Sequence, residues 1–482
     1  MPLHDEEMNR RREKREAQRR RREAEVRRLK RNLILAAVLL VVCGIAIFNL
    51  TRDFREKGPE GEVQDVMVQE TVEETKSPKA TAPVQKDPIT KIHIKAAGDL
   101  NITDSVVSSG LVASGYDYSR TFRDVAAVLS DADLTVMNFE GNVCGEPYGS
   151  ATTSAPIEIL HGLRNAGVDL LQTANSCIIN NGMIGLTTTL QAIRSAGIEP
   201  LGAYASAQEY RNSKGYTITE VNGVKVAFVA FTKGMNGRGM PAGNENLVNL
   251  LYTDYATEYL TVDKEGITET LKNVQTEKPD IVIALVHWGS EYNEDISSTQ
   301  KSIVSLMKKN GVDVILGTHP HMLQAIEYDE LDGTLVAYSL GDFFGDAERG
   351  ATNYSIILDN EITKDANSGT TKVTDYSYTP IYTLKASESG GDINYSRVVR
   401  IEKALEAYHG NFLDAITTGC KDSMDYALTR IEQRIATSEE AECPECGKAV
   451  TVLVNKEGNL VSGTTCKCGE TLPSGSKYSD YS

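Results

Sequence analysis

Short apolar runs, each followed by a polar residue, recur along the chain after residue 90. Runs of this length, rich in Val, Ile and Phe, predict buried β-strands. They lie at residues 92–97, 134–139, 168–173, 281–286 and 312–316. Between them, residues 186–196 and 302–309 repeat apolar positions at helical spacing and predict helices.

Two dipeptides mark tight turns between further apolar runs. Asn222-Gly223 and Asp332-Gly333 each separate two strand-like segments. Both dipeptides accept the positive φ angles of hairpin turns, so each predicts a pair of antiparallel strands. Strand–loop–helix units mixed with hairpins predict a mixed α/β fold.

Charge is distributed unevenly along the chain. The net charge is −17, yet residues 1–31 hold 13 Lys/Arg and only 7 Asp/Glu. The rest of the chain is therefore strongly acidic and lacks the basic surface that nucleic-acid binding needs. An acidic body also repels polyanions, so an anionic polymer would need a local cationic or metal site.

Composition divides the chain into six predicted segments. They are a basic cytoplasmic segment, a transmembrane helix, an acidic stalk, an α/β domain, a mostly helical segment and a cysteine-rich tail. Their predicted bounds are 1–31, 32–52, 53–90, 91–390, 391–438 and 439–482.

The transmembrane prediction rests on the uncharged apolar run at residues 33–50. A helix of this length spans ~27 Å, about one hydrocarbon core. Basic residues at 27–31 precede the run, so the positive-inside rule predicts a single-pass protein with a cytoplasmic N-terminus and an extracytoplasmic main domain. A cleaved signal peptide is the alternative, although the basic region is long and no small-x-small site follows.

Polar residues able to bind metal follow several of the predicted strands. They are Asp99, Glu140, Asn175, His287, His319 and His321. Carboxylates, amides and imidazoles are ligands of divalent transition metals, and a two-metal site needs about this many groups. In an extended His-x-His segment both imidazoles would point to one face. Taken singly, Asp99 is as readily a turn residue and His287 a core histidine.

The motifs around these residues occur in the order seen in the CapA capsule-synthesis family, which the chain resembles over residues 91–345. They are Gly98-Asp99, Asn138-Phe139-Glu140, Ala174-Asn175, His287-Trp288-Gly289, Gly317-Thr318-His319-Pro320-His321 and Tyr338-Ser339-Leu340-Gly341-Asp342-Phe343. The resemblance implies a metallophosphatase-like, four-layer α/β/β/α sandwich. It also implies that the six candidate ligands line one site, and that the protein serves synthesis of poly-γ-glutamate or a similar surface polymer.

Two positions depart from the family pattern. Cys177 stands where the family usually has a histidine, and Asp342 where it usually has an asparagine. In phosphatase-like sites that histidine is expected to protonate the leaving group or stabilise the transition state, and a thiol donates hydrogen bonds only weakly. Our candidate catalytic residues are His287, His319 and Cys177, with a small buried hydrophobe as the alternative role of Cys177.

The tail carries two close pairs of cysteines. Cys443 and Cys446 are three apart, and Cys466 and Cys468 are two apart. Four thiolates on two short turns predict one tetrahedral zinc in a ribbon-like tail. Disulfides are the alternative, because an oxidising compartment would favour them.

These observations favour a metal-dependent hydrolase or transferase of surface-polymer synthesis. The metal of the main site is left open among Mn, Zn and Fe, and the expected partners are the membrane and an anionic polymer or its synthesis complex. One alternative is a catalytically impaired member that binds the polymer or the complex. Another is a plain phosphoesterase with no connection to polymers.

Overall fold

The computed structural model describes residues 88–412 and 415–482. The predicted cytoplasmic segment, the transmembrane helix and nearly all of the predicted stalk lie outside these residues.

The predicted membrane localisation is contradicted. Among the residues that the structure describes, no helix is long and apolar enough to cross a bilayer. The longest of the described helices, α10 (Thr418–Ile435), carries six charged side chains within 18 residues. A bilayer core accepts a span of about 20 predominantly apolar residues, so this helix is far too polar.

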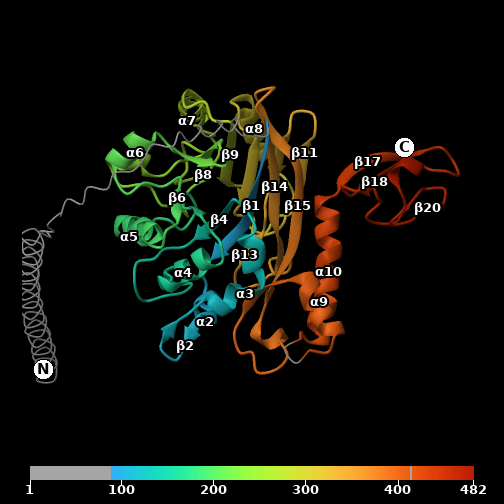
Figure 1. Ribbon diagram of the computed structural model, residues 1–482, viewed down its shortest axis with the longest axis horizontal. Helices are drawn as coiled ribbons and strands as arrows, with labels where there is room; N and C mark the ends of the chain where they lie inside the picture. Colours follow the sequence, from blue (N-terminus) through green and yellow to red (C-terminus); the bar gives the residue numbers. More distant parts are fainter. Residues whose placement is uncertain (1–87, 413–414) are drawn as a thin grey trace, which may run out of the picture. The chain divides into compact units, whose positions relative to one another are not determined.

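One large sheet forms the centre of the chain (Figure 1). Its strands run in the order β16 (Arg397–Arg400), β15 (Thr370–Leu384), β14 (Tyr354–Asp365), β1 (Ile89–Asn101), β4 (Leu134–Glu140), β5 (Leu170–Gln172) and β6 (Glu199–Leu201). The short β13 (Asp342–Phe344) also pairs with β1. Strands β1, β4, β5 and β6 are parallel, so their carboxyl ends share one edge.

A second sheet packs against the first. Its order is β11 (Ile326–Asp329), β12 (Thr334–Ala337), β10 (Val314–Thr318), β9 (Ile281–His287), β8 (Val224–Thr232) and β7 (Tyr216–Val221). Both predicted hairpins are confirmed as the antiparallel pairs β7–β8 and β11–β12. Side chains from the two sheets, such as Ile94 and Phe228, are fully buried in one shared core.

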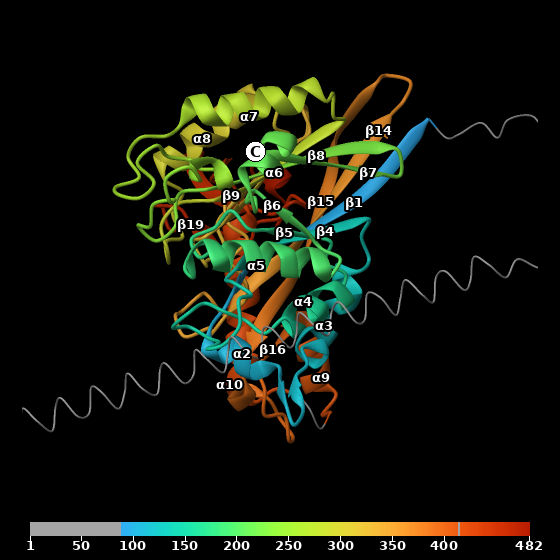
Figure 2. The ribbon, with the colours of Figure 1, turned by 90° about the vertical axis from the view of Figure 1, so that its left-hand side faces the viewer.

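Helices cover the outer faces of both sheets (Figure 2). The first sheet is covered by α3 (Ser119–Leu129), α4 (Glu158–Asn165) and α5 (Gly182–Ser195), and the second by α7 (Lys264–Thr276) and α8 (Ser298–Lys309). The shorter α2 (Asp104–Ser109) and α6 (Ala207–Ser213) lie in connecting segments. The predicted layered α/β arrangement is therefore confirmed.

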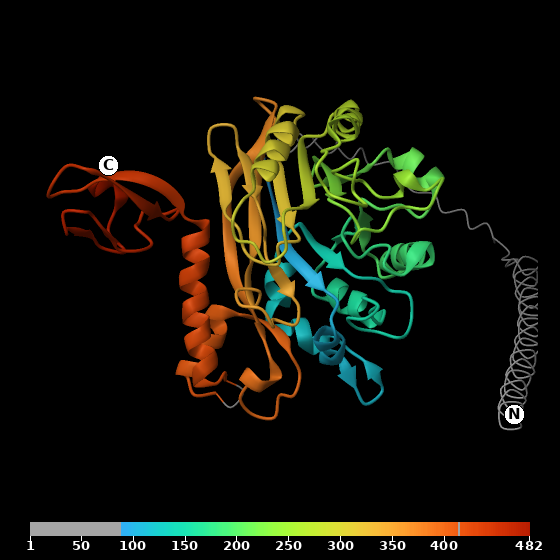
Figure 3. The ribbon, with the colours of Figure 1, turned by 180° about the vertical axis from the view of Figure 1, so that it is seen from behind.

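The C-terminal part begins with two helices that pack on β15 and β16 (Figure 3). They are α9 (Ile401–His409) and α10, which buries Met424, Ala427 and Ile431 in the shared core. The tail then forms β17 (Thr437–Glu442), β18 (Ala449–Val454), β19 (Thr464–Thr465) and β20 (Thr471–Leu472). It has a small apolar core of its own, to which Val452 and Leu472 belong.

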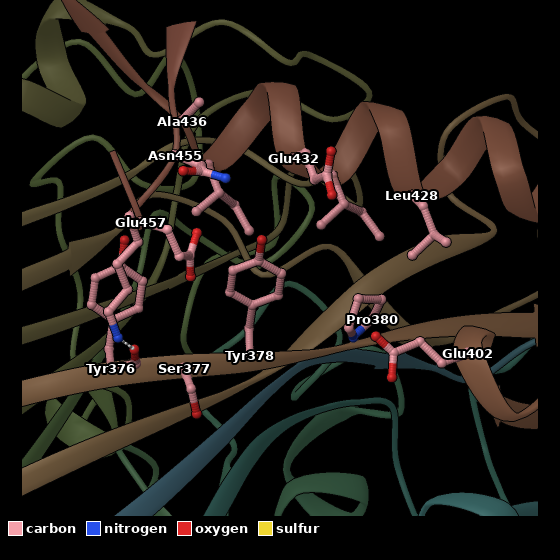
Figure 4. Close-up of a pocket in the computed structure, with 13 residues that line it drawn as sticks. Tyr376, Ser377, Tyr378, Pro380, Glu402, Leu428, Glu432, Ala436, Asn455 and Glu457 are labelled. Carbon is pink, nitrogen blue, oxygen red and sulfur yellow. Dashed lines mark hydrogen bonds between the residues drawn. The ribbon is translucent and has the colours of Figure 1, made fainter. Parts of the chain in front are cut away.

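A cavity of about 340 Å³ lies where β15, α10 and the tail meet (Figure 4). Lys456 of the tail donates hydrogen bonds to Asp375 and to the carbonyl of Tyr376. Tyr378 stands between Glu432 of α10 and Glu457 of the tail. Burial and these two carboxylates raise the pKa of Tyr378 to about 12, so its phenol stays neutral at physiological pH.

One half-buried acid should make stability depend on pH. Burial raises the pKa of Asp313 to about 6, while its carboxylate accepts a hydrogen bond from the Val282 amide at 2.8 Å. The unfolded pKa is about 3.9, so the folded state holds this proton more tightly. Asp313 therefore destabilises the fold above pH 6, and that cost disappears below about pH 4.

We expect Asp313→Asn to stabilise the protein by about 2 kcal/mol at pH 8, because the amide oxygen can still accept the Val282 bond. The gain should vanish by pH 4, as measured by urea unfolding at both pH values. An equal gain at both would contradict the shifted pKa.

Candidate metal centre

Five of the six predicted ligands converge at the carboxyl ends of neighbouring parallel strands. Asp99 lies near the end of β1, Glu140 ends β4 and His287 ends β9, while His319 and His321 follow β10. These residues meet in one place because the carboxyl ends of the parallel strands in both sheets lie beside it.

The three histidines lie close together and are buried. The ring centroids of His287 and His319 are 4.6 Å apart, and those of His319 and His321 are 6.1 Å apart. His287 Nε2 and His319 Nδ1 are separated by 3.1 Å. Such distances allow the three imidazoles to share one metal cluster.

The backbone reason for this convergence differs from the predicted extended His-x-His. His319 and His321 have φ angles of +92° and +60°, in the left-handed region that side chains rarely adopt. Strand β10 ends at Thr318, so the two histidines sit on a sharp bend. One hydrogen bond helps to keep this bend in place: the His319 amide donates to Asp99 Oδ2 at 3.0 Å. Strained backbone of this kind is typical of functional sites.

Glu140 lies between the histidines. Its Oε1 is 3.4 Å from His287 Nε2, and its Oε2 is 4.0 Å from His321 Nε2. Oε2 is buried without a hydrogen-bond partner in the described part of the chain. A buried carboxylate oxygen without a partner is costly, and a cation in this position would remove the cost.

Burial and neighbouring charges shift the pKa values of the acids and histidines in the centre. Burial and the neighbouring Glu140 carboxylate raise the pKa of Asp99. Burial also raises the pKa of Asp342 to about 7. Burial alone would lower the pKa of His321, but Asp342, 2.8 Å from its Nδ1, holds it well above its usual value. His319 is the opposite case, because burial and then the neighbouring His287 hold its pKa well below the usual value.

The donor atoms fall into overlapping groups within 4.8 Å of one another. Glu140, His287 and His319 form one group, and Asp99, Glu140 and His321 form a second. Glu140 belongs to both, as a bridging carboxylate would. Together with the buried Glu140 Oε2, which accepts no hydrogen bond from the described residues, this donor set fits one or two divalent cations.

Asn175 borders the centre, but its amide already makes hydrogen bonds within the protein. Its Nδ2 donates to Asn138 Oδ1 at 3.0 Å and to the Phe139 carbonyl at 2.7 Å, and its Oδ1 accepts from the Cys177 amide at 3.1 Å. Its role as a metal ligand stays a prediction.

Cys177 is buried beside the centre. Burial, followed by the nearby Glu140 charge, raises the pKa of its thiol well above the usual value. The group is therefore a neutral thiol at physiological pH rather than a nucleophilic thiolate.

Three further residues of the centre were missed by the sequence analysis. Ser176 Oγ lies 3.0 Å from His287 Nε2, and Asn138 Nδ2 donates to Asp99 Oδ1 at 2.5 Å. Glu291 forms a third donor group with His319 and His321. Of the three, Asn138 lies within the motif that contains Glu140, so its position near a strand end could have identified it.

The tail cysteines form a separate cluster in which all four sulfur atoms lie within 4.8 Å. Cys443 and Cys468 are 3.6 Å apart at sulfur, as are Cys446 and Cys466. A disulfide needs about 2.05 Å, whereas sulfurs around a tetrahedral zinc with bonds of about 2.3 Å lie about 3.8 Å apart. The arrangement is a candidate metal site, and zinc stays a prediction.

Fold and centre together define a two-sheet α/β protein with a buried histidine–carboxylate cluster. The chain belongs to the family of bacterial capsule synthesis proteins termed PGA_cap, whose sequence profile matches residues 65–347. The family resemblance predicted from the ordered motifs is thus confirmed.

Two relatives illustrate the match. The chain is 27% identical over 277 residues to the capsule biosynthesis protein CapA of Bacillus anthracis, covering 55% of this chain and 63% of that protein. It is 28% identical over 249 residues to the PGA biosynthesis protein CapA of Bacillus subtilis strain 168, covering 51% and 61%. The match thus spans about three fifths of either relative.

Solved structures with a loosely similar arrangement include two bacterial proteins. The calcineurin-like phosphoesterase YfkN of Bacillus subtilis matches with a TM-score of 0.37 and 18% identity, covering 71% of this chain and all of that one. A phosphatase of Mycoplasma pneumoniae matches with a TM-score of 0.38 and 14% identity, covering 61% and 94%. At these TM-scores neither likeness decides the fold or the function of this chain.

Proposed function

We propose that this protein acts in the synthesis of an anionic surface polymer of the poly-γ-glutamate class, through a divalent-metal centre that hydrolyses or transfers an amide or phosphate group. The observation that carries the proposal is the Glu140 carboxylate, which is shared by two donor groups and whose buried Oε2 has no hydrogen-bond partner among the described residues. The names of the CapA relatives support the polymer class.

The residues of the centre have distinct roles in this proposal. A bound divalent ion would polarise the reacting group and lower the pKa of a bound water. Asp99, Glu140, His287, His319 and His321 would hold the metal, with Asn175 at the border. His319 is neutral and ready to bind, whereas His321 must release its proton to Asp342 or to solvent, so metal affinity should fall at low pH. Mn, Zn and Fe all suit this donor set.

A second candidate function is supported by Cys177. A neutral thiol in place of the expected histidine favours a member that binds the polymer, or a complex that synthesises it, without turnover. Incubating the full chain and Mn²⁺ with γ-linked glutamate oligomers, or with phosphate esters, separates the two. Cleavage products support the enzyme, and saturable oligomer binding without products supports the binding protein.

For the tail we propose one zinc held by Cys443, Cys446, Cys466 and Cys468. Alkylation of the purified protein under denaturing, chelating and non-reducing conditions should label all four, because zinc release frees thiols. Absence of labelling at these four positions would show disulfides instead. Cys420, also buried, serves as the internal control for complete denaturation.

A further inference from the structure

We propose that Glu291 is an additional metal ligand on the solvent side of the centre, and that α10 holds it there through Glu294. This inference rests on the proposed metal centre and adds to it a ligand and the element that positions that ligand. Two observations carry it, which are the third donor group and the contacts that fix the segment after β9.

Glu291 contributes an exposed carboxylate to a group otherwise made of buried imidazoles. Its oxygen and the nitrogens of His319 and His321 all lie within 4.8 Å of one another. Two imidazoles and one carboxylate are a common donor set for divalent transition metals, and they leave coordination positions open. On the solvent side, an open position is where a substrate oxygen could bind.

The neighbouring residue fixes Glu291 at this place. The Tyr292 amide donates to the Pro320 carbonyl at 2.9 Å, between the two histidines in sequence. Its ring stacks on His321, with centroids 5.5 Å apart and planes 28° from parallel. The Arg349 guanidinium lies 3.9 Å above the Tyr292 ring centroid. Glu291 is therefore tied to the same bend that carries the histidines.

The rest of the segment is tied to the fold by side-chain bonds to its backbone. Gln324 Nε2 donates to the carbonyls of Asn293 and Asp295, at 2.9 and 3.2 Å. Gln324 in turn accepts from Gln300 of α8 at 3.0 Å. Both glutamines are buried, so these hydrogen bonds are shielded from water and fix the segment that follows β9 to the protein interior.

Glu294 joins the segment to α10. Its carboxylate accepts hydrogen bonds from Arg430 Nη2 at 3.3 and 3.0 Å and also contacts Arg434. All three side chains are about a quarter exposed, so the pairing is less screened than a surface ion pair. Because α10 leads directly into β17, the same helix connects the Glu291 segment to the cysteine tail.

Mn²⁺ binding to the full chain tests the inference, because Mn²⁺ prefers oxygen and imidazole donors to the tail thiolates. The electron paramagnetic resonance signal of free Mn²⁺ gives the affinity without any substrate. We expect Glu291→Gln to weaken binding by about 10- to 100-fold and Glu294→Gln by about 2- to 30-fold. Glu220→Gln, an equal charge change on the distant β7 hairpin, should leave the affinity unchanged.

The double variant separates positioning from a general structural effect. If Glu294 acts through Glu291, adding Glu294→Gln to Glu291→Gln should weaken Mn²⁺ binding no further. Wild-type affinity in Glu291→Gln would overturn the ligand assignment while leaving the proposed centre standing. Additive losses in the double variant would overturn the α10 part. A wild-type chain that binds no Mn²⁺ would overturn both this inference and the proposed function.

Discussion

Replacing Glu140 with glutamine should abolish most divalent-metal binding at the main centre. We expect Mn²⁺ affinity to fall by at least about 10²-fold, above the range typical of residues that only support a ligand. The reason is that Glu140 belongs to two donor groups at once, so one substitution removes a negatively charged donor from both. Glutamine keeps the shape of the side chain and loses its charge.

Two measurements check this prediction. Free Mn²⁺ can be titrated as for Glu291, and thermal unfolding can be followed with and without Mn²⁺. Metal at 100 times its wild-type Kd should stabilise the wild type by about 2.7 kcal/mol, and this gain should fall to about 0.4 kcal/mol or less in Glu140→Gln. Glu220→Gln provides the control for charge alone. Unchanged metal stabilisation in Glu140→Gln would show that the carboxylate is not a ligand.

The same centre shows how far sequence reasoning reaches. Placing polar residues after predicted strands found Asp99, Glu140, His287, His319 and His321, because parallel strands deliver their carboxyl ends to one edge. What the rule did not predict is the backbone conformation of the last two residues, which lie on a bend instead of an extended strand. The bend brings the His319 amide to the Asp99 carboxylate, 220 residues earlier in the chain, and no local sequence pattern records that contact.

Ser176 and Glu291 were missed for a related reason. Neither residue type stands out in a sequence, since serines and glutamates are common on surfaces. Their roles emerge only when the segments after β5 and β9 fold against the histidine bend. Distance in space, rather than spacing in sequence, defines them.

The fold was predicted best where the apolar pattern was local. Strands β4 and β9 and both hairpins follow from their own residues, whereas the long pair β14–β15 was not predicted. Strand β15 is mostly polar along its exposed half and contains Pro380, a residue that normally argues against a strand. Its stability comes from pairing with β14 along nearly its whole length and from α10 packing on it.

Strand β1 illustrates the same limit at the centre itself. The sequence predicts that it ends at Gly98-Asp99, yet the strand continues to Asn101. Asp99 pairs with Asp342 of β13 and with Asn138 of β4, with a register irregularity beside it. Pairing partners from distant segments keep this stretch extended although glycine and aspartate are poor strand formers.

The surroundings of Cys177 determine what a histidine at this position would do. Cys177 is 7% exposed, and its amide donates a hydrogen bond to the Asn175 side-chain oxygen, so position 177 is held at the edge of the centre. A histidine there would be larger than the thiol and should cost about 1–3 kcal/mol of stability through overpacking. It would also supply the acid–base group that a neutral thiol lacks.

We therefore expect Cys177→His to raise Mn²⁺-dependent hydrolysis of p-nitrophenyl phosphate esters by about 10²-fold, the low end for a positioned acid–base group. Mn²⁺ affinity should stay close to that of the wild type, because the gain comes from proton transfer rather than from a new ligand.

Cys177→Ala is the matched control, since it removes the thiol without adding an acid. If Cys177→Ala gains as much as Cys177→His, the thiol merely obstructs the site. Efficient turnover by the wild type would contradict the catalytic part of this prediction, and Ser176, whose Oγ lies 3.0 Å from His287 Nε2 and 3.5 Å from His319 Nδ1, would then be the next residue to replace.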